Sequence, residues 1–330
     1  MTIPAPISDF DHALDAVCTA HLGGPLKNCA RLSGGASQES YSFTCADETF
    51  VLRRPPGGIA KTSGSNALSM TDEARALQYV HAAGVRVPEV VYICQPDDGL
   101  GPGYVMRFIA GQTIARKILR DEAFAPVRPQ LAAQCGQMLA RLHALDETQI
   151  AGLPHSDARG ELEKYTKILR DHGHPHPVFE LAIRWLGDRV PEATTTRLVH
   201  GDFRLGNLMV RPEDGVVALL DWELAHTGDP MEDLGWPCVP SWRFGQHQNP
   251  VGGFGQREEF YAAYEAAGGS VDRDAVRFWE ILGTLKWGIM CTMMATAFIS
   301  GTDRSVERAS IGRRASETEI DLLRMLEGQD

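Results

Sequence analysis

The stretch L-V-H-G-D-F-R-L-G-N-L-M-V, residues 198–210, places the polar residues His200, Asp202 and Asn207 between two apolar runs. A second apolar run, V-V-A-L-L-D-W-E at residues 216–223, contains Asp221 fourteen positions after Asn207. Short buried strands beside these positions would hold the polar side chains rigidly. Carboxylate and amide oxygens suit Mg²⁺, and a further carboxylate can orient a hydroxyl nucleophile. The pattern therefore indicates a site for phosphoryl transfer, which needs little beyond positioning, metal and a base.

The composition is that of an ordinary folded protein with an acidic balance. The chain has 330 residues, of which 43% are hydrophobic and 23% charged, and its formal net charge is −11. This charge argues against nucleic acid or an anionic membrane as a partner, since either favours a basic face. A small-molecule substrate is the partner that we expect.

Cysteine usage and the chain start bear on the compartment. The seven cysteines are odd in number, scattered and free of any C-x-x-C pair, which is typical of reduced thiols in the cytoplasm. The start of the sequence is acidic and lacks a basic-then-apolar signal pattern. The most apolar stretch, residues 281–299, contains Lys286 together with Gly and Thr residues, and we interpret it as a buried helix of a cytoplasmic protein.

Hydrophobic periodicity divides the chain into two parts. A leading helix at residues 7–21 precedes strands at 30–33, 39–45 and 49–53, a helix from Thr71 to Gly84, and strands at 88–94 and 104–109. Helical patterns dominate from residue 130 onward, at 131–145, 161–170, 178–190, 257–267, 273–299 and 316–326. We therefore predict an N-terminal nucleotide-binding lobe at residues 1–109 and a C-terminal catalytic and substrate-binding lobe at residues 110–330.

The sequence His200-Gly201-Asp202-x-x-x-x-Asn207, followed by Asp221-Trp222-Glu223, resembles the aminoglycoside phosphotransferase and choline kinase family, distant relatives of protein kinases. The resemblance implies a two-lobed, protein-kinase-like α+β fold, with a small antiparallel-sheet lobe and a larger, mainly helical lobe. It implies ATP and Mg²⁺ as cofactors. It assigns Asp202 as the catalytic base and Asn207 and Asp221 as the Mg²⁺ ligands.

The N-terminal part extends the same resemblance. The run Ser33-Gly34-Gly35-Ala36-Ser37 is similar to the family's phosphate-covering turn, where glycines let the backbone approach phosphate. The strand V-L-R-R, residues 51–54, has arginine where relatives carry an ATP-binding lysine. Either Arg53 or Arg54 could replace that lysine, and alignment with the motif favours Arg53. The resemblance further implies Glu73 as the ion-pair partner of this arginine, and Met106 and Phe108 as parts of the segment whose backbone meets adenine.

The runs V-L-R-R-P-P, E-A-R-A-L and S-I-G-R-R-A-S-E-T-E-I-D-L-L resemble the kinase-like domains associated with acyl-CoA dehydrogenases. That resemblance implies a hydroxyacyl-CoA-type or other lipophilic alcohol as the phosphate acceptor. Three alternatives stay open: an aminoglycoside O-phosphotransferase, which predicts an acidic pocket; a nucleotide-binding regulator without turnover; and a protein kinase, against which stands the lack of a recognisable A-P-E-like segment after Asp221. The sequence leaves the acceptor, the preference for ATP over GTP and the oligomeric state undetermined.

Other conspicuous residues are interpreted as structural. We expect His200 to support its loop, Glu223 to cap a turn or stand near the metal, and Asp229 and Asp233 to be structural. Trp279, Trp287 and nearby methionines are typical of core, although the family resemblance implies that the late helices line the substrate side.

Overall fold

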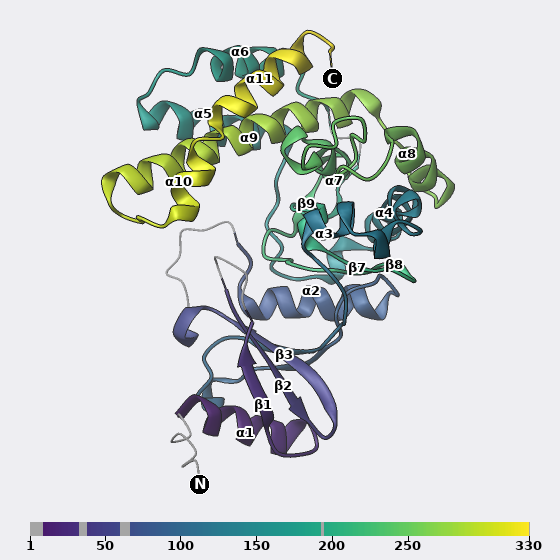
Figure 1. Cartoon of the computed structure of the whole chain (residues 1–330), viewed down its shortest axis with the longest axis vertical. Helices are drawn as coiled ribbons and strands as arrows, with labels where there is room; N and C mark the ends of the chain where they lie inside the picture. Colours follow the sequence, from purple (N-terminus) through teal and green to yellow (C-terminus); the bar gives the residue numbers. More distant parts are fainter. Residues whose placement is uncertain (1–8, 33–37, 60–66, 193–194, 330) are drawn as a thin grey trace. The chain divides into compact units, whose positions relative to one another are not determined.

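The computed structural model describes residues 9–32, 38–59, 67–192 and 195–329, and its chain falls into two compact units (Figure 1). The first unit comprises Met1–Gly111, Thr148–Leu153 and Val217–Ala225. The second comprises Gln112–Glu147, Pro154–Val216 and His226–Asp330. The first contains an antiparallel sheet and the second is mainly helical, so the α+β class predicted from the sequence is confirmed.

The first unit is built on a five-stranded antiparallel sheet with the order β1-β2-β3-β5-β4. Its strands are β1 (Lys27–Arg31), β2 (Glu39–Cys45), β3 (Glu48–Arg54), β4 (Val90–Ile93) and β5 (Tyr104–Arg107). Because side chains alternate along a strand, Phe50, Leu52 and Arg54 of β3 lie on one face, while Val51 and Arg53 lie on the other.

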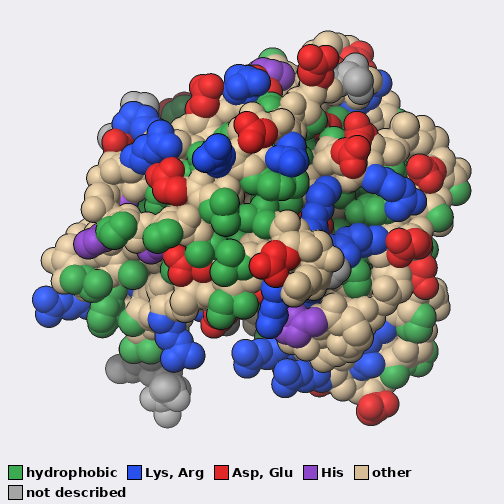
Figure 2. All heavy atoms as spheres, turned by 90° about the horizontal axis from the view of Figure 1, so that it is seen from above, with side chains coloured by type: hydrophobic (Ala, Val, Ile, Leu, Met, Phe, Trp, Pro, Cys, Tyr) green, Lys and Arg blue, Asp and Glu red, His purple; other side chains and the backbone are tan. Residues whose placement is uncertain are grey.

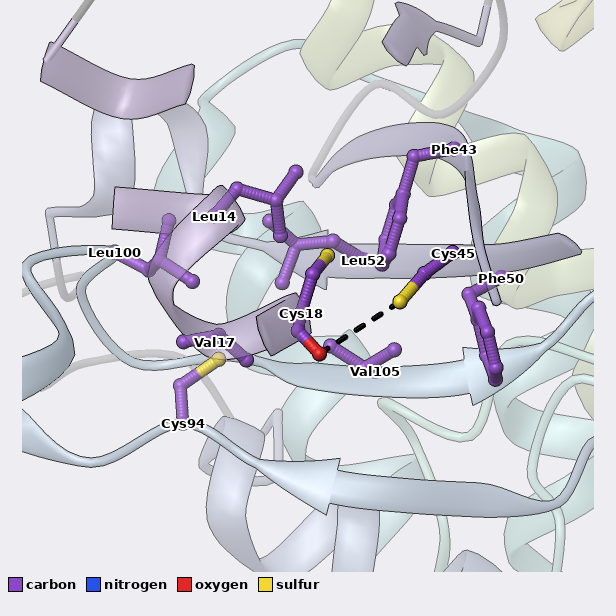
Figure 3. Close-up of a cluster of buried hydrophobic side chains, with 10 residues drawn as sticks. All are labelled: Leu14, Val17, Cys18, Phe43, Cys45, Phe50, Leu52, Cys94, Leu100 and Val105. Carbon is purple, nitrogen blue, oxygen red and sulfur yellow. Dashed lines mark hydrogen bonds between the residues drawn. The ribbon is translucent and has the colours of Figure 1, made fainter. Parts of the chain in front are cut away.

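Helices α1 (Asp9–His21) and α2 (Met70–Ala82) lie on opposite sides of this sheet (Figure 1). Figure 3 shows the core between α1 and the sheet, where the thiol of Cys45 donates to the backbone oxygen of Cys18 at 3.6 Å. Helix α2 begins where the Ser69 hydroxyl accepts a hydrogen bond from the Asp72 amide at 3.1 Å. Burial of one face of each helix thus fixes both to the sheet. The core residues drawn are Leu14, Val17, Cys18, Phe43, Cys45, Phe50, Leu52, Cys94, Leu100 and Val105.

The second unit contains nine of the α-helices assigned to the described residues. They are α3 (Ala115–Arg120), α4 (Leu131–His143), α5 (Ala158–His172), α6 (Pro177–Gly187), α7 (Met231–Gly235), α8 (Arg257–Ala266), α9 (Arg273–Ser300), α10 (Val306–Gly312) and α11 (Ala315–Leu326). Strand β6 (Arg197–Val199) pairs antiparallel with β9 (His226–Gly228). Strands β7 (Leu208–Arg211) and β8 (Gly215–Leu219) form another two-stranded sheet.

Helix α9 is the central helix of the second unit and packs against α5, α6, α7, α10 and α11. The Asp272 carboxylate caps its start, accepting from the amides of Asp274 and Ala275 at 3.0 Å each. Among the helices of the described residues, α9 alone is long and apolar enough to cross a membrane by length and composition. Half of that apolar window is buried inside the protein.

Short elements were the ones that the sequence did not predict. Helices α3 and α10 span six and seven residues, too few for a clear helical periodicity, and β9 has three. The long predicted helices at 131–145, 273–299 and 316–326 correspond to α4, α9 and α11 within one or two residues at each end.

On the face drawn in Figure 2, Lys and Arg side chains are interspersed with Asp and Glu.

Candidate active site

The loop after β6 carries the predicted catalytic aspartate in the second unit. Gly201 adopts a left-handed backbone conformation, with φ of 78°, that turns the chain sharply after the buried His200. The His200 ring nitrogen Nδ1 accepts a hydrogen bond from the Asp202 amide at 3.2 Å. His200 therefore supports the loop from within.

The carboxylate of Asp202 is held by three side-chain donors. Oδ1 accepts from the indole N–H of Trp236 at 2.7 Å and from Nε of Arg204 at 3.0 Å, while Oδ2 accepts from Nδ2 of Asn207 at 2.7 Å. A carboxylate oxygen offers two lone pairs. Both lone pairs of Oδ1 are thus engaged, whereas Oδ2 accepts from one side-chain donor among the described residues and keeps a lone pair for a ligand.

Asn207 is oriented by the same loop. Its Nδ2 also donates to the Asp202 backbone oxygen at 2.9 Å, which fixes which end of the amide is nitrogen. Within the described residues, Oδ1 of Asn207 has no hydrogen-bond donor. An amide oxygen left in this state is a suitable ligand for a hard cation.

The carboxylate of Asp233, in α7, holds the catalytic loop by its backbone amides. Its side chain is fully buried and accepts from the backbone amides of His200 at 2.7 Å and Gly201 at 3.0 Å. His143 of α4 contacts the same carboxylate through Nε2 at 3.2 Å. Burial alone would raise the pKa of Asp233, but the hydrogen bond and charge of His143, with the contacts from His200, hold that pKa below its ordinary value.

Asp229 has a different role, although it lies only four residues before Asp233. Its carboxylate accepts from the indole N–H of Trp279 at 2.8 Å and from the amide of Met231 at 3.0 Å. Burial raises the pKa of Asp229 above its ordinary value. Asp229 therefore ties the start of α7 to α9, and among the described residues it makes no hydrogen bond to the catalytic loop.

In the first unit, Arg53 joins two of the predicted site residues. Its guanidinium forms an ion pair with Asp221 through Nη2, and its Nε lies 3.5 Å from Oε1 of Glu73. Glu73 is fully buried and also accepts from the Tyr104 hydroxyl at 3.0 Å. Burial raises the pKa of Glu73, against the opposing charge of Arg53.

The neighbouring Arg54 lies on the opposite face of β3. Its guanidinium stacks over the Phe10 ring at 4.3 Å and donates to the Leu100 backbone oxygen at 3.0 Å. The sequence left open which arginine replaces the family's lysine. Strand alternation places Arg53 with Glu73 and Asp221, and it directs Arg54 into the α1 side of the sheet.

Asp221 and Glu223 lie in the chain segment that follows β8. Asp221 has a φ of 66°, a left-handed conformation that costs a non-glycine residue on the order of 1 kcal/mol and is typical of functional sites. Glu223 accepts from Nε2 of Gln38 at 3.4 Å, and its backbone oxygen accepts from the Leu68 amide at 2.9 Å. Glu223 thus helps to anchor this segment within the first unit.

The remaining predicted nucleotide contacts are only partly described. The turn Ser33, Gly34, Gly35, Ala36 and Ser37 lies outside the described residues. Met106 lies in β5 opposite Val51 and Val90. Phe108 follows β5 with its side chain 45% exposed, and its amide donates to the Thr49 oxygen at 3.0 Å, so that amide is already engaged.

The two predicted Mg²⁺ ligands offer an amide oxygen and a carboxylate, which are ligand types that suit a hard cation. The described residues contain no group of three or more His, Cys, Asp and Glu side chains that could hold a metal. Mg²⁺ in phosphotransferases is usually bound by one or two protein oxygens together with phosphate oxygens and water. Asn207 in the second unit and Asp221 in the first each carry a side-chain oxygen of this kind.

Three residues near Asp202 were missed by the sequence reasoning. Arg204 and Trp236 contact its carboxylate directly, and the ammonium of Lys286 of α9 lies 5.2 Å from the ring centroid of Trp236. Arg204 lies within the quoted motif and could have been singled out by its charge. Trp236 and Lys286 are distant in sequence from the motif, so no local pattern identifies them.

Family comparison matches residues 28–279 of the chain to the phosphotransferase enzyme family. Among curated proteins, acyl-CoA dehydrogenase family member 10 of Mus musculus is 31% identical over 250 residues, which are 72% of this chain and 22% of that protein. Acyl-CoA dehydrogenase family member 11 of Pongo abelii is 26% identical over 287 residues, which are 78% of this chain and 36% of that protein. The chain therefore spans about a third or less of the length of these relatives.

Solved structures with the same fold come from several small-molecule kinases. A candidate aminoglycoside phosphotransferase from Ralstonia eutropha has a TM-score of 0.77 and 23% identity, with 96% of this chain and 98% of that chain covered. A choline/ethanolamine kinase family protein from Mesorhizobium loti has a TM-score of 0.65 and 21% identity, with 94% of each chain covered. Spectinomycin phosphotransferase, solved with ADP and spectinomycin, has a TM-score of 0.66 and 13% identity, with 96% and 99% covered. The kinase-like fold is thereby confirmed.

Proposed function

Because the chain belongs to the phosphotransferase enzyme family, we propose that it transfers the γ-phosphoryl group of ATP to a hydroxyl group of a small molecule. The arrangement around Asp202 carries the proposal. Its carboxylate is fixed by Trp236, Arg204 and Asn207, with one lone pair of Oδ2 left for a substrate. A fixed carboxylate of this kind is what orientation of a hydroxyl nucleophile requires.

In the proposed reaction, Oδ2 of Asp202 accepts the hydrogen bond of the acceptor hydroxyl and receives its proton. The acceptor oxygen forms a bond to the γ-phosphorus, and the bond between that phosphorus and the β,γ-bridging oxygen breaks. ADP leaves with the electron pair of the broken bond. Arg204, bound at Oδ1, contributes positive charge beside the reacting group.

We propose Asn207 and Asp221 as Mg²⁺ ligands and Arg53 as the cation that binds phosphate. Bound Mg²⁺ would neutralise charge on the phosphate oxygens. Arg53 offers the planar, bidentate donor set that suits phosphate, and Glu73 holds it in position. The ion pair of Arg53 with Asp221 supports this assignment, because it brings the proposed phosphate donor and a proposed metal ligand together.

For the acceptor, we propose a hydroxyacyl-CoA-type molecule or another lipophilic alcohol. Both reported curated relatives are named as acyl-CoA dehydrogenase family members, and this chain matches part of each. Aromatic side chains lie beside Asp202, since Trp236 contacts Trp242 at 5.4 Å between ring centroids and Trp242 contacts Trp287 at 4.9 Å. Indole rings offer a large apolar contact area that suits an acyl chain.

An aminoglycoside acceptor remains the second candidate, supported by the fold shared with the Ralstonia protein. It requires acidic groups that bind several ammonium groups. Turnover with a panel of aminoglycosides, set against a panel of hydroxyacyl thioesters and free hydroxy acids, separates the two candidates. Phosphorylation of aminoglycosides alone would contradict the acyl proposal and leave the kinase proposal standing.

The experiment that tests catalysis compares wild type with Asp202→Asn. The variant should lose at least about 100-fold in turnover, because the asparagine cannot receive a proton, while its affinity for nucleotide should change little. Nucleotide affinity is measured by titration with a fluorescent ATP analogue. A wild type that binds nucleotide but phosphorylates no alcohol across both panels, with no difference from Asp202→Asn, would favour the non-catalytic regulator.

A further inference from the structure

Near Trp236, which donates to Asp202, two buried indole donors have no acceptor among the described residues, and one nearly buried ammonium has only long ion pairs. The indole Nε1 atoms of Trp242 and Trp287 are buried, and within the described chain neither finds a hydrogen-bond partner. Buried polar groups are normally paired, so an unpaired donor points to a missing ligand or water. Because the Trp242 and Trp287 rings are in contact, one missing ligand or water can account for both unpaired donors.

Lys286 is the third donor. Its side chain is only 14% exposed, and its Nζ has no hydrogen bond among the described residues. The two carboxylate oxygens within 4 Å belong to Glu161 at 3.7 Å and Glu232 at 3.9 Å, both beyond hydrogen-bond length. Burial by itself would lower the pKa of Lys286, but Tyr165, Glu232, Glu161 and Asp202 raise it, so the ammonium stays charged.

The three donors belong to one cluster. The ammonium of Lys286 lies 5.2 Å from the ring centroid of Trp236, the residue that donates to Asp202. Trp236 packs on Trp242, and Trp242 packs on Trp287, which follows Lys286 in α9. We call Lys286, Trp242 and Trp287 the donor cluster.

Close packing of α9 brings the cluster to Asp202. A β-carbon at Gly283 would lie 2.9 Å from the ring of Trp236 and 2.9 Å from Cγ2 of Val239. The absence of a side chain there lets the Trp236 ring lie against α9. Lys286 and Trp287 come three and four residues later, so they lie on the same face of the helix one turn further on.

We propose that the donor cluster is the specificity-determining site for the acceptor, and that it binds an acyl oxygen, as a carboxylate or an acyl carbonyl, while rejecting ammonium groups. This inference rests on the proposed function of Asp202. The chemistry follows from the donor set, since indole N–H and ammonium groups donate only. A ligand that offers oxygen acceptors satisfies all three, whereas an ammonium group would add donors and a like charge.

The charges around the cluster agree with this selectivity. Arg204 lies with its guanidinium 5.0 Å from the Trp242 ring centroid, and Lys286 lies on Trp236. Oε1 of Glu161 lies 2.8 Å from Nζ of Lys164, and Oε2 of Glu232 lies 3.2 Å from Nε2 of His226, so both carboxylates also have a partner other than Lys286. Each of these carboxylates therefore divides its charge between Lys286 and a second partner, while Arg204 and Lys286 are the positive side chains that lie over the Trp242 and Trp236 rings.

The test uses binding as well as turnover. Three C8 ligands with the same hydroxyl position and a carboxylate, a primary amide or an ammonium head group are titrated against the full chain while tryptophan fluorescence is followed. Wild type should bind the carboxylate tightest and the ammonium compound weakest. Lys286→Met should weaken carboxylate binding by roughly 10- to 100-fold, the loss expected for a charged hydrogen bond, and Trp287→Phe by about 10-fold.

Lys164→Met is the matched control. Lys164 shares Glu161 and the Tyr165 ring with Lys286, but it is 36% exposed and contacts none of the tryptophans of the cluster in the described structure. The control should bind the carboxylate like wild type. Equal losses in Lys286→Met and Lys164→Met, or an ammonium ligand bound more tightly than the carboxylate, would overturn the inference.

The two proposals fail separately. Should all three ligands bind equally while Asp202→Asn still abolishes turnover, the donor-cluster inference is wrong and the kinase proposal holds. Should carboxylates bind selectively to a chain that phosphorylates nothing, the cluster is a ligand site and the kinase proposal is wrong. Urea unfolding of Lys286→Met and Trp287→Phe, followed by far-UV circular dichroism and expected to be cooperative as in wild type, shows that each variant is folded.

Discussion

Replacement of Asp233 by asparagine should destabilise the second unit and slow turnover together. Asp233 accepts from the amides of His200 and Gly201 and contacts His143, all in a fully buried position. The asparagine oxygen can serve one amide, but its NH₂ group then faces the other donor. One unsatisfied buried donor costs about 1–3 kcal/mol, and the loss of charge on the remaining bond adds about 1 kcal/mol.

We therefore expect a loss of about 3 kcal/mol in the free energy of unfolding at pH 7. Urea unfolding followed by tryptophan fluorescence measures it, because five of the six tryptophans, all except Trp222, belong to the second unit. Turnover should fall as well, since the amides that Asp233 holds position Asp202. Nucleotide affinity, which we assign to Arg53 and Glu73 of the first unit, should change little.

The stability difference between wild type and Asp233→Asn should also depend on pH. The pKa of Asp233 lies below its ordinary value of 3.8 in the folded protein, so its carboxylate stabilises the fold fully above that value. The stability difference between wild type and Asp233→Asn should be constant from about pH 5 to 8. It should shrink only as the pH falls below 3.8 toward the folded-state pKa.

Asp229→Asn is the control for this experiment. The pKa of Asp229 is raised by burial, so the stability that it contributes is greatest below pH 3.8 and declines as the pH rises toward its folded-state pKa. The control should leave turnover unchanged, since the described hydrogen bonds of Asp229 go to Trp279 and Met231 and not to the loop. An Asp233→Asn variant within 0.5 kcal/mol of wild type at pH 7, roughly the scatter of neutral surface changes, or with unaltered turnover, would refute the reasoning.

Three further predictions concern single side chains. Arg53→Met should weaken nucleotide binding by about tenfold or more, because a charged hydrogen bond to phosphate is lost. Arg54→Met should lower only the stability of the protein. Nucleotide titration distinguishes the two variants, and equal affinities would contradict the assignment of Arg53. Gly283→Ala should cost about 1–3 kcal/mol in urea unfolding, because its methyl group collides with Trp236. Trp236→Phe should lower kcat about tenfold and leave nucleotide affinity intact, because Asp202 loses a 2.7 Å hydrogen bond. An unchanged kcat would show that Arg204 alone is enough to orient the Asp202 carboxylate.

The motif around Asp202 carried most of what could be predicted about the chemistry. The residue types and spacing from His200 to Asn207 are local, and chemistry that depends on adjacent residues can be recognised from the chain alone. Long helices such as α9 were also predictable, because their apolar periodicity extends over many turns. The assignments of Asp202, Asn207 and Asp221 to catalysis and metal binding remain predictions.

Only the tertiary structure separated residues that the sequence treats alike. Arg53 and Arg54 are identical neighbours, and the two faces of β3 send one to Glu73 and the other to Phe10. Asp229 and Asp233 are both acidic and buried, yet their pKa values shift in opposite directions. Burial raises the pKa of Asp229, whereas His143 and backbone amides hold the pKa of Asp233 below its ordinary value.

The residues that we propose as selective for the acceptor were also invisible in the sequence. Trp242, Lys286 and Trp287 of the donor cluster are separated from Asp202 by 40 positions or more. They meet because α9 packs closely at Gly283, and no local pattern encodes that contact. The sequence by itself determined the kind of reaction, since its catalytic motif is contiguous; the tertiary structure decided which side chains surround the reacting carboxylate, since burial and pairing depend on contacts between distant segments.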